Sequence, residues 1–222
     1  MELFAQQVLA GIATGGIYAL MALAIVMIYL AIRHLNFAQG EMGMFSAFVA
    51  WQLIAWGVPY WFAFAITVAL SFVAGALIER VVIRPIQHAP ALSHLVVFIA
   101  LLTIFNSLAG AIWDFSIKPF PSPFGDAPLF GAGLIGAHQA GMLAVILIVL
   151  AALFLFFRFT RLGLALRAAA AHPQSAELVG IRIGRMRALG WGLAAAIGAI
   201  VKSGASAEMR RDESVRRSYL GN

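Results

Sequence analysis

Residues 3–32 form one uninterrupted stretch without a charged side chain. About 20 apolar residues are enough for a helix to cross the hydrocarbon core of a bilayer, so this stretch predicts a membrane-spanning helix. The alternative is a cleaved signal peptide. A signal peptide is disfavoured because no basic region precedes the stretch, because the stretch is too long, and because Tyr18 and Tyr29 suit a retained helix.

The composition of the whole chain supports the same interpretation. Of the residues, 63% are hydrophobic and only 11% are charged, and the mean hydropathy is +0.94. Such a chain cannot cover itself with a water-compatible surface, so it needs lipid around it. It contains no cysteine, which excludes disulfides, thiolate chemistry and cysteine-based metal sites.

Four further apolar segments lie at about residues 37–56, 60–78, 95–113 and 142–157, and a shorter one lies at residues 188–201. With the first stretch they predict an all-α fold, a polytopic transmembrane helical bundle with about five full spans and one short or partial helix. The break at residues 57–59 lies between Trp56 and Tyr60. It predicts a helical hairpin whose aromatic rings lie at a membrane interface.

Arginine residues occur in every second loop between these segments. They are Arg33, then Arg80 and Arg84, then Arg158, Arg161, Arg167, Arg182, Arg185 and Arg187. Cytoplasmic loops carry the excess of Lys and Arg, so these loops are predicted to be cytoplasmic. The N-terminus, the turn at residue 57 and residues 114–138 are then predicted to lie outside. This topology explains the net charge of +6 better than nucleic-acid binding does.

Gly11, Gly15 and Ala19 recur at four-residue spacing in the first predicted helix. The spacing places small side chains on one face, where another helix can approach closely. We therefore expect a helix-packing face here, which supports a bundle without indicating a function.

Two polar regions interrupt the apolar pattern. The first contains Asn36, Gln39 and Glu41, which we expect at or just inside the membrane edge. Polar groups at that depth cost several kcal/mol unless they are partnered or face water, so these three are candidates for the translocation path. The alternative is that Glu41 lies in the headgroup layer near Arg33 and only fixes the topology.

The second polar region is the alanine-rich stretch at residues 158–187. Its helix-forming residues are broken by Pro173 and Gly180, which predicts short helices at the membrane surface. A compact helical loop below a bundle suits an element that couples the bundle to another protein. The alternative is a basic amphipathic segment that rests on anionic lipid.

Three motifs together resemble the permeases of branched-chain amino acid ABC transporters. They are the Gly-Gly-Ile-Tyr-Ala-Leu-Met-Ala-Leu run at residues 15–23, the Asn-Phe-Ala-Gln-Gly-Glu-Met run at residues 36–42, and residues 161–181. The resemblance covers about residues 3–200 and is closer to the first of the two paralogous permeases that such systems pair.

This resemblance implies a subunit of an importer in the bacterial inner membrane, without catalysis or a cofactor of its own. Its partners would be a second permease subunit, two cytoplasmic ATP-binding subunits and a periplasmic binding protein that delivers leucine, isoleucine or valine. It also implies that about residues 167–180 form the coupling helix, which sits in a groove of the ATPase. The residues assigned to this coupling loop are Arg161, Gly163, Arg167, Ala168, Glu177 and Gly180.

The chain departs from this family pattern after residue 187. The segment at residues 188–201 is short for a crossing and is followed by a basic stretch, so we expect an interfacial or half-inserted helix. Residues 1–201 are then an incomplete permease domain that lacks part of the translocation path, and from the sequence the shortened chain is not expected to transport. Residues 202–222 form a charged tail; residues 207–221 look like the C-terminus of the same system's ATPase, which suggests a fusion, the alternative being an unrelated soluble tail.

Two other classes of protein compete with this interpretation. An intramembrane enzyme would need a nucleophile and base or a set of metal ligands, and no His-Glu-x-x-His or Gly-x-Ser-x-Gly pattern is present. The histidines fall mostly near loop ends, as interfacial residues do. A secondary transporter or channel would need paired charges near the membrane midplane, and only Glu41 and Glu79 come close.

Overall fold

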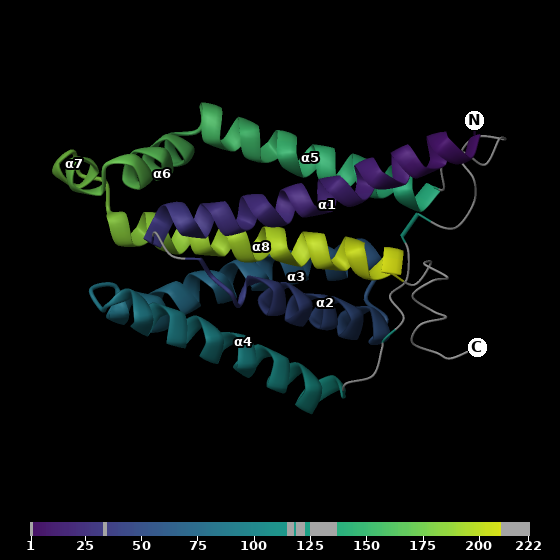
Figure 1. The fold of residues 1–222 in the computed structure, drawn as a ribbon, viewed down its shortest axis with the longest axis horizontal. Coiled ribbons are helices and arrows are strands. Elements are labelled where there is room, and N and C mark those ends of the chain that lie inside the picture. The colour runs from purple at the N-terminus through teal and green to yellow at the C-terminus, as the bar shows by residue number, and fades with distance from the viewer. Residues whose placement is uncertain (1, 33–34, 115–117, 119–122, 125–136, 210–222) are drawn as a thin grey trace.

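The computed structural model describes residues 2–32, 35–114, 118, 123–124 and 137–209. Helices dominate these residues, and none of them forms a strand, which confirms the all-α prediction (Figure 1). The helices are α1 (Glu2–Ile32), α2 (Gln39–Ala55), α3 (Tyr60–Ile78), η1 (Glu79–Ile83), η2 (Arg84–Ile86), α4 (Ala91–Trp113), α5 (Ala137–Phe159), α6 (Arg161–Ala171), α7 (Pro173–Leu178) and α8 (Ile183–Met209). Arg33, most of the predicted outer loop and residues 210–222 lie outside the described part.

Four of the described helices are long and apolar enough to cross a membrane: α1, α3, α4 and α5. Their outward faces carry large apolar side chains, such as Ile12, Leu70, Ile104 and Ile148. Exposed side chains of this kind are compatible with lipid and not with water. The chain is therefore a multi-pass membrane protein.

Helix α8 forms the interior of the bundle, and it is longer than the apolar segment at residues 188–201 from which a short last helix was predicted. It has 27 residues, which at about 1.5 Å per residue gives a length of roughly 40 Å. It packs against α1, α2 and α3, and Trp191, Ala194 and Ile197 on it are buried (Figure 1). Because its neighbours shield it from lipid, α8 can be rich in Gly and Ala instead of large apolar residues. It continues through the predicted domain boundary at residue 201.

Small residues let α3 and α8 approach each other closely. A Cβ atom added at Gly75 would lie 2.6 Å from the Trp191 carbonyl oxygen and 2.7 Å from Ala195 Cβ. One turn away, Ser71 Oγ donates a hydrogen bond to Ser46 Oγ of α2 at 2.8 Å. Close backbone approach and side-chain hydroxyl bonds are the usual means of helix association in lipid.

Helix α2 is shorter than the span that the sequence predicted. It has 17 residues and starts beside the middle of α8, because Gln39 Nε2 donates to the Ala194 carbonyl at 2.8 Å. Further along, the Cβ position of Gly43 lies 3.0 Å from the Gly198 carbonyl oxygen. Helix α2 therefore lies along the half of α8 that ends at Met209 (Figure 1).

The predicted hairpin between α2 and α3 is confirmed. Gly57 has a φ of +88°, a left-handed conformation that glycine adopts without strain. Its N–H donates to the Ile54 carbonyl, and the Val58 N–H donates to the Leu53 carbonyl, which closes α2 with a Schellman motif. Trp56 and other tryptophans gather at this end of the bundle, as residues at a membrane interface do.

Candidate functional site

Asn36 and Gln39 hold the start of α2 inside the bundle. The Oδ1 atom of Asn36 accepts a hydrogen bond from the Ala38 N–H at 3.0 Å, and its backbone carbonyl accepts one from the Gln39 N–H at 3.3 Å. The Gln39 side chain binds the Ala194 carbonyl of α8, as described above. Both polar side chains are buried, so their visible contacts are with the chain itself.

Glu41 faces a different helix. Its Oε2 atom accepts a hydrogen bond from Asn106 Nδ2 of α4 at 3.4 Å. Asn106 is exposed and Glu41 is partly exposed, so this pair lies on the outside of the chain. Sequence reasoning did not identify Asn106. The available signal was its spacing from Thr103 and Ser107, which gives an otherwise apolar helix one polar side.

The contacts of Gln39 and Glu41 place the start of α2 along the length of its neighbouring helices and not at their ends. At about 1.5 Å per residue, Ala194 lies roughly 16 Å from the start of α8, and Asn106 lies roughly 22 Å from the start of α4. Both helices begin at the end of the bundle that carries α6 and α7 (Figure 1). Gln39 contacts Ala194 and Glu41 contacts Asn106, so α2 begins near the mid-length of α8 and about two thirds of the way along α4.

The small-residue face of α1 packs against no other helix in the part of the chain that the structure describes. Nothing lies within 4 Å of the Cβ position of Gly11 or Gly15, and Ala19 is exposed. The neighbouring Gly16 does pack internally, because its Cβ position is 3.1 Å from Ile146 of α5. Packing of the face of Gly11, Gly15 and Ala19 against another helix stays a prediction.

Helices α5 and α6 meet at a sharp corner. Thr160 Oγ1 accepts a hydrogen bond from the Gly163 N–H at 2.9 Å and donates one to the Phe156 carbonyl at 2.6 Å, so Thr160 caps the start of α6. Gly163 is buried, and a Cβ atom there would collide with the Phe156 carbonyl oxygen. Within the predicted coupling loop, Gly163 therefore forms the corner and does not lie on the surface.

Replacing Gly163 by alanine is expected to destabilise the protein by about 2 kcal/mol, because the added methyl group overpacks the corner. Helix propensity alone would give the opposite sign, since alanine is better than glycine by about 1 kcal/mol inside a helix. Thermal unfolding of the detergent-solubilised protein measures the difference. Leu164→Ala, at the exposed next position, is the control and is expected to change stability little. A Gly163→Ala protein that unfolds at or above the wild-type temperature contradicts the expectation.

Helix α7 begins at Pro173 and ends before Gly180, as the sequence predicted. Proline suits the first turn of a helix because it has no N–H to leave unsatisfied. Gly180 has a φ of +86°, and its N–H donates to the Glu177 carbonyl at 2.9 Å. The Ile181 N–H donates to the Ala176 carbonyl at 3.0 Å, which completes a Schellman motif.

Helices α6 and α7 and the turn after them, residues 161–180, form what we call the α6–α7 corner. It presents both charged and apolar side chains at one end of the bundle. Most of the predicted coupling-loop residues are exposed there, namely Arg161, Arg167, Glu177 and Gly180, while Ala168 is half-buried. At the tip, Leu178 is 90% exposed and Val179 is 77% exposed. Adjacent apolar side chains that protrude to this extent are typical of a contact surface.

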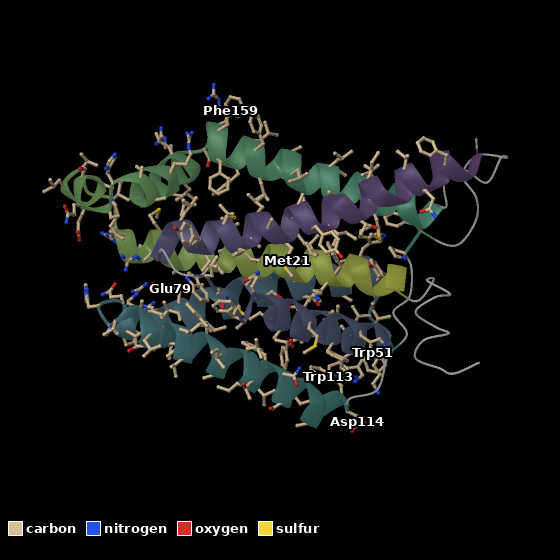
Figure 2. All side chains as sticks on the ribbon, in the orientation of Figure 1. Met21, Trp51, Glu79, Trp113, Asp114 and Phe159 are labelled. Carbon is tan, nitrogen blue, oxygen red and sulfur yellow. The ribbon has the colours of Figure 1, made fainter. Side chains whose placement is uncertain are left out.

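Arg84 connects the start of α8 with the residues that follow α3. Glu79 is buried and pairs with Arg84 at 2.8 Å, within the π-helical turn and the 3₁₀ turn that follow α3. Arg84 also donates to the Gly184 carbonyl in the first turn of α8 at 2.7 Å. Figure 2 places Glu79 toward the end where α6 and α7 lie. A movement of α7 can thus reach α3 through the first turn of α8.

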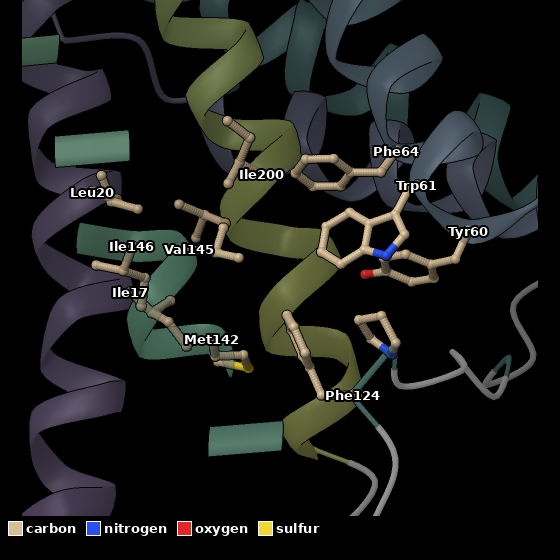
Figure 3. A pocket seen from close by; sticks show the side chains of 12 residues that line it. Ile17, Leu20, Tyr60, Trp61, Phe64, Phe124, Met142, Val145, Ile146 and Ile200 are labelled. Carbon is tan, nitrogen blue, oxygen red and sulfur yellow. The ribbon is translucent and has the colours of Figure 1, made fainter. Parts of the chain in front are cut away.

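An apolar cavity lies near the opposite end, between α1, α3, α5 and α8 (Figure 3). Its lining includes Ile17, Trp61, Met142 and Ile200, and none of the lining residues is ionisable except Tyr60. A zwitterionic ligand needs groups that bind an ammonium and a carboxylate. This cavity is therefore poorly suited to a free amino acid.

Within the described residues, no three His, Cys, Asp or Glu side chains lie close enough together to hold a metal ion. His88 and His172 are exposed near helix ends, as we expected for interfacial histidines. His94 differs, because it is buried in the first turn of α4 with Nδ1 3.3 Å from the Pro90 carbonyl oxygen. It faces the end of α3 and contributes to a polar pocket with Glu79 and Arg84.

Comparison with known proteins identifies this arrangement. Residues 7–204 match the family described as the permease component of branched-chain amino acid transport systems. The high-affinity branched-chain amino acid transport system permease protein LivH of Escherichia coli K12 is 31% identical over 214 residues, which cover 89% of this chain and 68% of LivH. BraD of Pseudomonas aeruginosa, a permease protein of the same description, is 31% identical over 212 residues, 89% of this chain and 69% of its own.

A more distant relative is the probable branched-chain amino acid transport permease protein LivH of Methanocaldococcus jannaschii. It is 28% identical over 197 residues, which cover 82% of this chain and 59% of the relative. No solved structure matches the chain. The family match extends over most of the helical bundle, including α2 and the α6–α7 corner. This chain belongs to the family of permease components of branched-chain amino acid transport systems.

Proposed function

We propose that this chain is a permease subunit of an ATP-driven importer for leucine, isoleucine and valine. The observation that carries the proposal is the combination of a lipid-facing bundle with an exposed helical corner at one end, in a member of this permease family. Such a corner is what a membrane subunit needs to receive movement from a soluble motor. The chain supplies part of the translocation path, and ATP hydrolysis belongs to its partners.

The α6–α7 corner is the proposed docking element for a cytoplasmic ATP-binding subunit. Leu178 and Val179 would fill an apolar groove of that subunit, and Arg161, Arg167 and Glu177 would contribute charged contacts at its rim. Interfaces commonly combine an apolar centre with a polar rim in this way. The Schellman motif at Gly180 and the Glu79–Arg84 pair support a rigid connection from α7 to the bundle.

A second permease subunit is the proposed partner within the membrane. The face of Gly11, Gly15 and Ala19 is free of contacts within the described chain and would allow close approach of a helix. A periplasmic binding protein would dock at the opposite end of the bundle from α6 and α7. In this proposal the chain lies in the bacterial inner membrane with its N-terminus outside.

Cysteine labelling tests this orientation directly, because the chain has no cysteine of its own. Ala55 ends α2 and Ser175 lies in α7, and both are exposed. In intact spheroplasts, we expect an impermeant maleimide to label Ala55→Cys. Ser175→Cys should react only after the membrane is permeabilised. The reverse pattern would contradict the proposed topology.

Transport itself is tested by expressing the chain with its full set of partner subunits in a host that lacks its own branched-chain amino acid importer. We expect uptake of radiolabelled leucine that depends on ATP and on the binding protein. This differs from the expectation from the sequence, because the last helix, α8, has 27 residues and packs against α1, α2 and α3. An ATPase-inactive partner subunit is the control for passive entry. Leucine uptake at the empty-vector level, with all subunits present in the membrane, would refute the proposed function.

A further inference from the structure

The carboxylate of Glu41 has an unusual setting for a membrane protein. It lies in the first turn of α2, and α2 begins near the mid-length of α8 and about two thirds of the way along α4. A helix that begins inside a membrane is a recurrent feature of transporter binding sites. Its partner Asn106 lies roughly 22 Å from the start of α4 and roughly 10 Å from its end at Trp113, so the carboxylate lies within the length of α4.

The charge of Glu41 is not balanced by the part of the chain that the structure describes. The salt bridge found among those residues joins Glu79 and Arg84, and the hydrogen-bond partner of Glu41 is the neutral amide of Asn106. An unpaired carboxylate in hydrocarbon costs several kcal/mol, so it must face water or a cation. The charge of Glu79, in contrast, is balanced by Arg84 at 2.8 Å.

The surface beside Glu41 is also unsuited to lipid. Asn106 is exposed, and Thr103 and Ser107 lie three residues before it and one residue after it on the same outward side of α4. Among the described residues, nothing lies within 4 Å of the Cβ position of Gly40, the residue before Glu41. Intramembrane polar groups of this kind face a water-filled path or a partner and not lipid tails.

Apolar surface adjoins the same pair. Phe45 lies one turn after Glu41 on α2, and its ring meets that of Phe105, the residue before Asn106, edge to face with centroids 5.5 Å apart. Both rings are half-buried, so part of each remains accessible. A carboxylate, an amide and an aromatic surface thus lie together between α2 and α4.

We infer that Glu41 and Asn106 bind the α-ammonium group of the transported amino acid, whose alkyl side chain lies against Phe45 and Phe105. This inference rests on the proposed function. The ammonium donates hydrogen bonds to the Glu41 carboxylate and to Asn106 Oδ1, which is left as an acceptor because Nδ2 already donates to Glu41. The cation supplies a positive charge that the described residues do not place beside Glu41, and the polar side of α4 forms one wall of the path.

The test uses the complete importer, reconstituted in proteoliposomes, with initial leucine uptake measured over a range of binding-protein-delivered leucine. Glu41→Gln keeps the size of the side chain and removes its charge. We expect uptake to fall by at least about tenfold, because a charge-assisted hydrogen bond is lost. Glu41→Asp keeps the charge and should restore most of the uptake. Asp114→Asn, the same change at the exposed end of α4, should leave uptake unchanged.

A second readout separates ammonium binding from other roles. The 2-hydroxy analogue of leucine, which lacks the ammonium group, should compete poorly for the wild-type importer. In Glu41→Gln the preference for leucine over this analogue should shrink. Uptake by Glu41→Gln within twofold of wild type would overturn the inference while the proposed function stands. Absence of leucine uptake by the wild-type complex would instead overturn the proposed function.

Glu41 could pair with the ammonium group of the substrate or with a positively charged side chain of the second permease subunit, and measuring subunit assembly distinguishes the two. Co-purification of partner subunits with Glu41→Gln at the wild-type ratio supports the inference, and loss of the second permease subunit alone overturns it. Should Glu41→Gln fail to accumulate, Asn106→Ala tests the same site without changing charge. Asn106→Ala is expected to lower uptake severalfold, and wild-type uptake in that variant would overturn the inference.

Discussion

Replacing Leu178 by aspartate is expected to reduce ATP-dependent leucine uptake to less than about a tenth of the wild-type rate, while the protein still inserts and assembles its bundle. Leu178 is 90% exposed at the tip of α7, so the free subunit loses no internal contact. In the proposed complex the side chain enters a groove of the ATP-binding subunit. Truncating an apolar residue at the centre of an interface commonly costs about 2 kcal/mol or more, and a buried, unpaired charge adds to that cost.

The measurement compares uptake with the ATPase rate of the complex and with the amount of ATP-binding subunit that co-purifies. Leu92→Asp is the matched control. Leu92 is 70% exposed at the start of α4, at the same end of the bundle but outside the α6–α7 corner. An aspartate in the first turn of a helix is favourable for the helix dipole, so this control should transport normally. Equal losses in both variants, or normal uptake with Leu178→Asp, would contradict docking at α7.

The helix boundaries of the α6–α7 corner could be predicted because local backbone chemistry sets them. Pro173 begins α7 since proline fixes φ and has no N–H, and Gly180 ends it since its φ is +86°. Gly57 acts in the same way at the α2–α3 turn. Signals of this kind depend on a few neighbouring residues and can be read without knowing the tertiary structure.

The central position of α8 could not be predicted because it depends on contacts with helices that are distant in sequence. Hydropathy measures how well a segment suits lipid, but α8 is covered by α1, α2 and α3. Ala194 and Gly198 are small because neighbouring helices pack closely against them. A Cβ atom added at Gly198 would lie 3.0 Å from Gln39 Nε2. A segment with these residues is a weak lipid-facing span and a good core helix.

The candidate site was predicted in part. Asn36, Gln39 and Glu41 were identified because polar residues are costly within apolar segments. Their position beside the middle of α8 was not predicted, because a hydrogen bond between Gln39 and Ala194, 155 residues apart in sequence, positions α2. The partner of Glu41, Asn106, is 65 residues away and could be connected with it only through the fold.

The contact between α3 and α8 leads to the prediction with the largest effect on stability. Gly75→Val is expected to prevent the bundle from packing, because even the first added carbon would lie 2.6 Å from the Trp191 carbonyl oxygen. That oxygen belongs to the backbone of the central helix, so no side-chain rotation relieves the collision. The two helices must separate, which also disturbs the Ser46–Ser71 hydrogen bond between α2 and α3.

The expected cost of Gly75→Val is at least about 3 kcal/mol, the upper part of the range for overpacked cores, against a total stability of roughly 5–15 kcal/mol. Ala74→Val is the matched control, because Ala74 is the preceding residue of α3 and is exposed. Membrane content and thermal unfolding in detergent should be near wild type for Ala74→Val and strongly reduced for Gly75→Val. Equal membrane content and equal unfolding temperatures of the two variants would show that Gly75 does not lie 2.6 Å from the Trp191 carbonyl oxygen when a Cβ is added. That result would also contradict the assignment of α8 as the central helix.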